Sequence, residues 1–160
     1  MALALETERL TLSLRDETDA EWYRELVRER GEETLTLAES TARLARFRDL
    51  TIEIGIGALT IRRRTDGDAI GYCALIVGRG SLDEPEIAYE LLRRFHGQGY
   101  ATEAAQALVA AAAATGRRRL WSTVGAWNVP SLRVLEKVGF RVDHTVADDR
   151  GDTVYLTREL

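Results

Sequence analysis

The segment of residues 94–103, RFHGQGYATE, decides how the rest of the chain is interpreted. It lies between a predicted strand and a predicted long helix, and the first turn of a helix has backbone N–H groups without intrahelical partners. Glycine at Gly97 and Gly99 would let a phosphate approach those donors, whereas a side chain would occupy the phosphate's space. A plain turn between two elements uses glycine as well, so this segment alone leaves both interpretations open.

Two common phosphate-binding motifs do not fit the segment. The dinucleotide fingerprint needs a third glycine where Thr102 stands, and an acidic residue about 20 positions further on, where residues 117–119 are all arginine. The P-loop needs Gly-Lys followed by Ser or Thr, which the segment lacks. The pattern that remains is Arg/Gln-x-x-Gly-x-Gly/Ala, which Arg94, Gly97 and Gly99 satisfy.

Hydrophobic periodicity and turn residues divide the chain into strands and helices. Strands are predicted at 10–14, 57–64, 69–77, 84–92, 120–125, 140–147 and 153–157, with turns at 66–67 and 148–151. Helices are predicted at 16–30, 37–50, 101–115 and 129–138. Hairpins combined with one helical crossover predict an α/β protein of the α+β type. Its sheet is expected to be mixed and mostly antiparallel, with about seven strands flanked by about four helices in one domain over residues 1–160.

Composition excludes several classes of protein. The formal charge of −4 argues against binding along a nucleic acid backbone, which needs a basic face. No stretch approaches the roughly 20 apolar residues of a membrane helix, and no signal peptide is visible, so we expect a cytoplasmic protein without a membrane partner. Cys73 is the one cysteine and is expected to be inert packing in an apolar strand. Neither Cys73 nor the two histidines, His96 and His144, has metal-ligand spacing, so no metal site is predicted.

Three stretches resemble the Gcn5-related N-acetyltransferases (GNAT). Residues 86–104, EIAYELLRRFHGQGYATEA, are similar to the family's pyrophosphate-binding motif with its preceding strand. Residues 128–140, NVPSLRVLEKVGF, resemble the next motif, Asn-x-x-Ser followed by Glu-Lys-x-Gly-Phe. Residues 7–12, TERLTL, look like the start of the RimJ/RimL-type branch, which acetylates protein N-termini and assorted small amines. The similarity covers nearly the whole chain and is closest over residues 70–142.

The resemblance implies a GNAT fold with splayed central strands, in which acetyl-CoA is the cosubstrate. The backbone of residues 98–102 would hold its pyrophosphate, and strands 84–92 and 120–125 would diverge around the pantetheine arm. Asn128 matches an asparagine that contacts the β-alanine portion, and Ser131 a serine close to the thioester sulfur. The full set of cofactor-binding residues implied by the resemblance is Leu91, Leu92, Arg94, Gly97, Gln98, Gly99, Tyr100, Ala101, Thr102, Asn128 and Ser131.

The resemblance also implies a reaction, the direct transfer of an acetyl group to a primary amine in a ternary complex. An α-amino group has a pKa of about 8 and a lysine about 10.4, so a general base is useful at neutral pH. Glu86 matches a strand glutamate that serves as the base in several relatives. Glu84 and Glu90 share its strand face by period-2 alternation and are rivals for that role. Tyr89 falls on the opposite face and is expected to be core or a wall of the slot.

The residue that protonates the leaving thiolate stays open. Many relatives place a tyrosine directly before Glu-Lys-x-Gly-Phe, where this chain has Leu135. Either Ser131 supplies the proton, so that Glu86 and Ser131 form the catalytic set, or the thiolate leaves unassisted. Leu135 also keeps open a coenzyme-binding sensor without catalysis. The acceptor is undetermined among peptide N-termini and small-molecule amines, and family analogy favours a homodimer.

Overall fold

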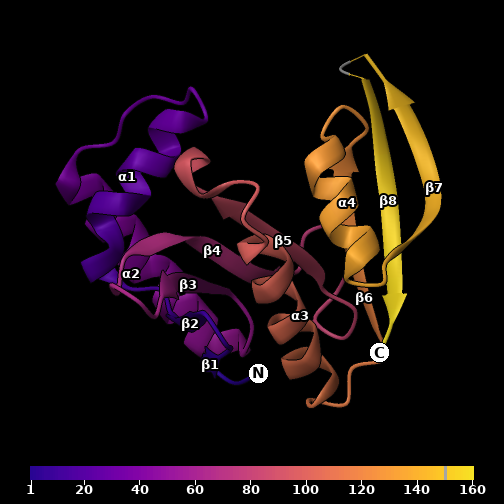
Figure 1. Cartoon of the computed structure of the whole chain (residues 1–160), viewed down its shortest axis with the longest axis horizontal. Coiled ribbons are helices and arrows are strands. Elements are labelled where there is room, and N and C mark those ends of the chain that lie inside the picture. The colour runs from indigo at the N-terminus through magenta and orange to yellow at the C-terminus, as the bar shows by residue number, and fades with distance from the viewer. Residues whose placement is uncertain (150) are drawn as a thin grey trace.

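The computed structural model describes residues 1–149 and 151–160, which form one open sheet with four α-helices (Figure 1). The strands are β1 (Ala4–Glu6), β2 (Leu10–Leu14), β3 (Ala58–Arg63), β4 (Ala69–Ile76), β5 (Glu86–Leu91), β6 (Arg119–Gly125), β7 (Arg141–Asp148) and β8 (Gly151–Glu159). The helices are α1 (Ala20–Glu29), α2 (Leu37–Ile54), α3 (Tyr100–Ala113) and α4 (Val129–Lys137), and short 3₁₀ turns span Glu17–Asp19 and Arg93–Phe95.

The sheet order is β1-β2-β3-β4-β5-β6-β8-β7, and every neighbouring pair is antiparallel except β5 with β6. This confirms the predicted mixed, mostly antiparallel sheet. The eighth strand is β1, whose three residues are too few to show a hydrophobic period. The predicted turn at 148–151 includes residue 150, which lies outside the described residues.

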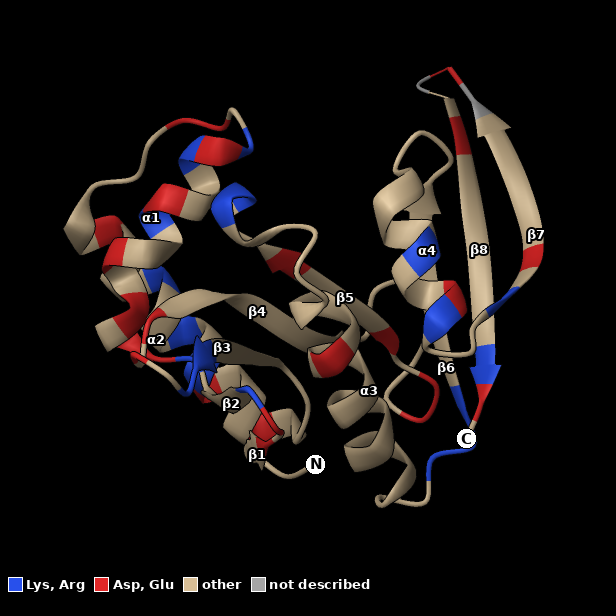
Figure 2. Ribbon diagram, viewed as in Figure 1, with Lys and Arg blue, Asp and Glu red and all other residues tan. Residues whose placement is uncertain are grey.

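The two faces of the sheet differ because side chains alternate along each strand. On β5, Ile87 and Leu91 enter the main core with Leu108 of α3. Glu90, one position away, instead pairs with Arg30 at the end of α1. Charges are frequent along α1, whereas Glu103 is the one charged residue of α3 (Figure 2). The apolar face therefore carries α3, and a more polar face lies under α1 and α2.

The two parallel strands β5 and β6 touch at one end only. Their one register pair joins Glu86 to Trp121, beside a hydrogen bond of 3.0 Å from the Trp121 amide to the Pro85 carbonyl. The next contact already uses a side chain, since the Ser122 hydroxyl donates to the Ile87 carbonyl at 3.2 Å. Beyond this point β5 has no β6 partner, so the predicted splay is present. None of the helices in the described part of the chain is long and apolar enough to span a membrane.

Candidate active site

The loop before α3 presents a row of backbone amides without partners. Gly97 and Gly99 both adopt positive φ angles, of 74° and 83°, which L side chains rarely reach. Gly99 is the N-cap of α3 and offers no side chain to cap it. Within the described residues, the amides of residues 97–102 donate no hydrogen bond, and the first helical bond runs from the Glu103 amide to the Gly99 carbonyl at 3.1 Å. Six consecutive N–H groups and the positive end of the helix dipole suit an anion.

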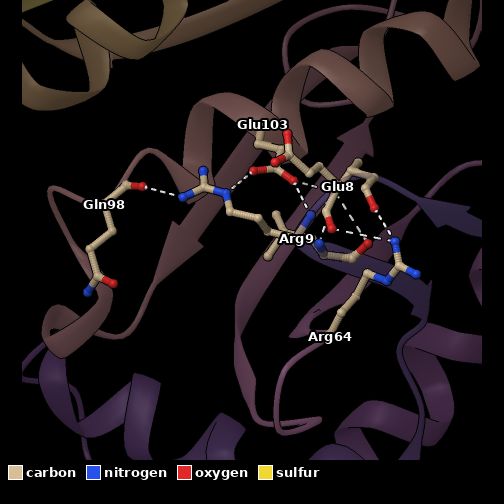
Figure 3. Close-up of polar contacts among 7 residues, drawn as sticks. Glu8, Arg9, Arg64, Gln98 and Glu103 are labelled. Carbon is tan, nitrogen blue, oxygen red and sulfur yellow. Dashed lines mark hydrogen bonds and ion pairs between the residues drawn. The ribbon is translucent and has the colours of Figure 1, made fainter.

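Arg9 fastens this loop to the start of the chain. Its Nη1 donates to the Gln98 carbonyl at 3.0 Å, and its Nε donates to the Glu103 carboxylate at 2.7 Å (Figure 3). The same carboxylate accepts the Thr7 hydroxyl at 2.6 Å and the Arg9 amide at 2.9 Å. Burial alone would raise the pKa of Glu103, but the hydrogen bonds from Thr7 and Arg9 outweigh it and lower the pKa. The carboxylate therefore holds β2 and the first turn of α3 in one arrangement.

Arg9 also reaches the anion-binding end of the helix. Its guanidinium lies 4.6 Å from the centre of the Tyr100 ring, and its Nη2 is 3.3 Å from the point where a Cβ on Gly99 would stand. A further arginine, Arg64, donates to the Thr7 carbonyl at 2.8 Å and supports the turn between β1 and β2. In the sequence, residues 7–10 (TERL) show only a resemblance to one branch of the GNAT family. Their structural role is to hold the loop before α3, and it depends on a contact between residues 9 and 98 that no local sequence pattern reveals.

Other loop residues hold the loop's own shape. The Arg94 guanidinium pairs with Glu25 of α1, while the Arg94 carbonyl accepts Nε2 of Gln98 at 3.2 Å. His96 Nε2 lies 2.8 Å from the Leu91 carbonyl, which turns the chain back onto the end of β5. The charge of Arg94 is thus engaged with a carboxylate on α1, and it is the Arg94 carbonyl, through its hydrogen bond to Gln98, that stabilises the loop.

The backbone of β5 that faces the splay belongs to Tyr89 and Leu91. Backbone groups alternate along a strand as side chains do, and the Leu92 amide donates to Ile70 of β4 at 2.9 Å. The Leu92 carbonyl accepts the Phe95 amide at 2.9 Å, so neither polar group of Leu92 is available to a ligand. Tyr89, not Leu92, is the second residue that joins Leu91 along this edge.

A tyrosine and a serine meet across the splay. The Tyr89 hydroxyl lies 3.0 Å from both the Ser131 hydroxyl and the Ser131 carbonyl, although one residue is on β5 and the other on α4. Burial raises the pKa of Tyr89 to about 12, and the hydrogen bond to Ser131 offsets part of that rise. Asn128 caps α4 by accepting the Ser131 amide at 3.3 Å. Leu135 is fully buried, and its aliphatic side chain has no proton to donate.

The three strand glutamates have different environments. Glu90 is neutralised by Arg30, and Glu84 accepts the Trp121 indole N–H at 3.1 Å and lies 3.7 Å from Arg119. Glu86 is 5% exposed, and among the described residues it forms no salt bridge. Its carboxylate accepts the Arg79 amide and, at 3.0 Å, the Thr123 hydroxyl. Glu86 is therefore a buried carboxylate held by neutral donors at the vertex where β5 and β6 part.

Two other features bear on the chemistry. Burial raises the pKa of the Cys73 thiol to about 12, which agrees with the predicted inert packing. Among the described residues, no group of three His, Cys, Asp or Glu side chains is placed to hold a metal ion. A hollow of about 420 Å³ lies between α3 and the end of α4, and one of about 560 Å³ lies between α4 and strands β7 and β8; neither is lined by residues 97–102 or by Glu86.

Comparisons with known proteins agree with this geometry. Residues 9–141 match the family model described as "Acetyltransferase (GNAT) domain". A GnaT-family acetyltransferase from Bordetella pertussis superposes with a TM-score of 0.81 at 26% identity, over 98% of this chain and 99% of the other. The ribosomal-protein-S5-alanine acetyltransferase of Vibrio fischeri gives 0.82 at 16% identity, over 99% and 97%.

A third structure contains coenzyme A. It is RimL, a ribosomal L7/L12 alpha-N-protein acetyltransferase bound to coenzyme A, which superposes with a TM-score of 0.84 at 18% identity over 98% of both chains. Comparison with curated proteins gave no significant match. The family model covers most of the chain. The chain therefore belongs to the GNAT acetyltransferases and is an acyltransferase.

Proposed function

We propose that this protein, as one catalytic domain over residues 1–160, transfers an acetyl group from acetyl-CoA to a primary amine in a ternary complex. The observation that carries the proposal is the row of six unpartnered amides at 97–102, fixed beside the splay by Arg9. A diphosphate ester carries the negative charge that such amides accept. The coenzyme A bound to the RimL neighbour supports the choice of this cosubstrate.

The residues present fit such a cosubstrate. The amides of Gln98, Gly99, Tyr100, Ala101 and Thr102 would hold the pyrophosphate, with Gly97 giving the chain its turn. The Tyr89 backbone and the Leu91 amide would offer hydrogen bonds to the pantetheine arm along the free edge of β5, where the Leu91 carbonyl already contacts His96. Ser131, facing Tyr89 from α4, would lie beside the sulfur, and Asn128 would contact the arm from the start of that helix.

The transfer forms a C–N bond and breaks a C–S bond, and it moves one proton from the amine and one onto the thiolate. We assign the first proton to Glu86, because a carboxylate held only by neutral donors keeps capacity to accept a proton. We assign the second to the Tyr89–Ser131 pair, whose neutral hydroxyls lie 3.0 Å apart. The raised pKa of Tyr89 keeps its proton available at neutral pH.

The test combines a binding assay with a turnover assay. Acetyl-CoA and coenzyme A at 100 times their dissociation constant should stabilise the protein by about 2.7 kcal/mol, or roughly 5–10 °C in Tm. ATP and NAD should not. Release of free thiol with a panel of amines then establishes catalysis. Stabilisation without thiol release would indicate a coenzyme-binding sensor, and equal stabilisation by ATP would refute the cosubstrate.

A further inference from the structure

Arg15 is a buried arginine that has no partner for its charge. The residue follows β2 and is 8% exposed, yet its guanidinium makes no hydrogen bond or salt bridge with any described residue. Its Nε is fully shielded from solvent and lacks an acceptor. Buried charges in proteins are normally paired, because an unpaired one loses its hydration without compensation. Burial also lowers the pKa of Arg15, with nearby Arg30 acting in the same direction and Asp19 in the other.

Three aromatic rings surround this guanidinium. The ring centres of Tyr23 on α1, Phe47 on α2 and Tyr72 on β4 lie 5.3, 5.2 and 5.1 Å from the Arg15 Cζ. Such contacts are attractive but occupy the faces of the guanidinium and leave its edge, where the N–H groups point, unsatisfied. Phe47 is 37% exposed, so one wall of this aromatic box reaches the surface.

The nearest charged groups are already committed elsewhere. Asp19 accepts the Trp22 indole N–H at 2.7 Å and the Thr60 hydroxyl at 2.6 Å, and it pairs with Arg62. Arg30 pairs with Glu90 on β5. Asp19 therefore cannot pair with Arg15 without breaking contacts of its own, and Arg30, a cation engaged with Glu90, repels it.

The register of the sheet places Arg15 in line with the proposed reaction centre. The Arg15 amide donates to Ala58, and Ala58 pairs with Ala74, which pairs with Ala88 on β5. Because these three alanine side chains are small, this row rises little above the sheet on the face beneath α1 and α2. Glu86 stands in the next row on the same face, since Ala74 and Ala88 are followed by the pair Ile76–Glu86. The guanidinium itself lies over Tyr72, which pairs with Glu90, so along the strands it is two rows, or about 13 Å, from the Ile76–Glu86 pair, with the low alanine row between them.

We infer that Arg15 binds a carboxylate of the acceptor, and that the acceptor is an elongated primary amine with its carboxylate at the end remote from the amine. The inference rests on the proposed acetyl transfer, because only that function places an amine at the splay. A single planar guanidinium suits a carboxylate, which it can hold through two parallel hydrogen bonds. No second unpaired cation adjoins it among the described residues to balance a phosphate dianion. The carboxylate of this acceptor would accept the Arg15 N–H groups, and its chain would extend over Ala74 and Ala88 to bring the amine toward Glu86.

The experiment compares acceptors that differ only in the carboxylate. Glycine, 4-aminobutanoate and 6-aminohexanoate form one series, and each is paired with its methyl ester. A second pair distinguishes a peptide source: C-terminally amidated peptides whose second residue is Glu or Gln. The variants are Arg15→Met and, as the matched control, Arg46→Met at an exposed position of α2.

The wild type should prefer at least one carboxylate over its neutral counterpart by roughly 10- to 100-fold in kcat/KM, the range expected for hydrogen bonds to a charged group. Arg15→Met should abolish that preference and leave activity with the esters and the Tm shift by coenzyme A intact. Arg46→Met should keep the preference. Because a buried unpaired charge is removed, the Tm of ligand-free Arg15→Met should equal or exceed that of the wild type.

The outcomes separate this inference from the proposed function. Turnover of amines with no carboxylate preference, or the same preference in Arg15→Met, overturns the role of Arg15 and leaves acetyl transfer standing. Calorimetric titration with 6-aminohexanoate in the presence of coenzyme A supplies a readout without turnover. If no amine is acetylated but wild type binds 6-aminohexanoate and Arg15→Met does not, the carboxylate site stands and the transferase assignment falls. A lower Tm for Arg15→Met together with unchanged titration would make Arg15 a structural residue.

Discussion

Replacing Arg9 by methionine is expected to weaken coenzyme A binding about tenfold while costing little stability. Methionine keeps most of the apolar stem and removes the guanidinium, which lies over Tyr100 and donates to Gln98 and Glu103. A hydrogen bond to a charged group contributes about 1.5–3 kcal/mol when buried. The Arg9 side chain is 44% exposed, so we take the lower end for its effect on the loop, which corresponds to about tenfold in affinity.

The stability cost is smaller because solvent screens the pair. Half-exposed ion pairs contribute about 0.2–1 kcal/mol, and for a chain of this length that corresponds to a decrease in Tm of at most about 4 °C. Arg28→Met, at an exposed position of α1, is the matched control and should change neither quantity. Titration calorimetry measures the affinity, and thermal unfolding of the ligand-free variants measures stability.

A truncated ligand shows whether Arg9 acts at the pyrophosphate. S-acetylpantetheine lacks the diphosphate that residues 98–102 are proposed to hold, so Arg9→Met should not weaken its binding. An equal loss for S-acetylpantetheine and acetyl-CoA would mean that the substitution disturbs the whole site. No loss for either ligand would refute the argument that Arg9 orients the loop through the Gln98 carbonyl.

Three further predictions concern the reaction centre. Glu86→Gln should lower kcat by about 10²- to 10⁴-fold, as expected for loss of a general base. The control Glu84→Gln should leave kcat within severalfold of the wild type. Similar losses in both variants would refute the assignment of Glu86 as the base. Ser131→Cys should form a mixed disulfide with oxidised coenzyme A, detected by intact mass, because the sulfur is proposed to lie beside this position; no adduct would place the sulfur elsewhere. Cys73, whose thiol has a pKa raised to about 12 by burial, should react with a disulfide reagent only after unfolding, so wild-type protein is the blank for the Ser131→Cys experiment.

The glycine loop, the helix that follows it and the start of α4 could largely be predicted from the sequence because their signals are local. A glycine loop, a following helix and the cap at Asn128 are each defined within a few residues, and backbone amides need no particular side chain. The positive φ angles at Gly97 and Gly99 show why the motif keeps glycine there. The bonding of the Leu92 backbone had no such local signal. Its polar groups are committed to Ile70 and Phe95, and that depends on the register between β4 and β5.

The sequence alone only partly distinguishes the proposed catalytic groups from their neighbours. Alternation along β5 put three glutamates on one face, but their differences come from Arg30 and Arg119, which are distant in sequence. The pairing of Tyr89 with Ser131 likewise joins residues 42 positions apart. A pattern along one strand fixes which face a side chain occupies, and only the neighbouring elements decide whether it is neutralised.

The acceptor side had no sequence signal because its defining property is a missing contact. Arg15 looks like an ordinary charged residue after a strand, and most arginines in such positions are solvated. Its significance comes from helices α1 and α2 and strand β4, which surround the guanidinium with aromatic rings and supply no carboxylate. Asp19, four residues away, instead accepts the Thr60 hydroxyl and pairs with Arg62. A protein selected only for stability would gain by replacing such a charge with an apolar side chain. Retaining an arginine there is consistent with a ligand whose carboxylate pairs with the guanidinium. The stability of Arg15→Met and its preference among acceptors must therefore be measured together.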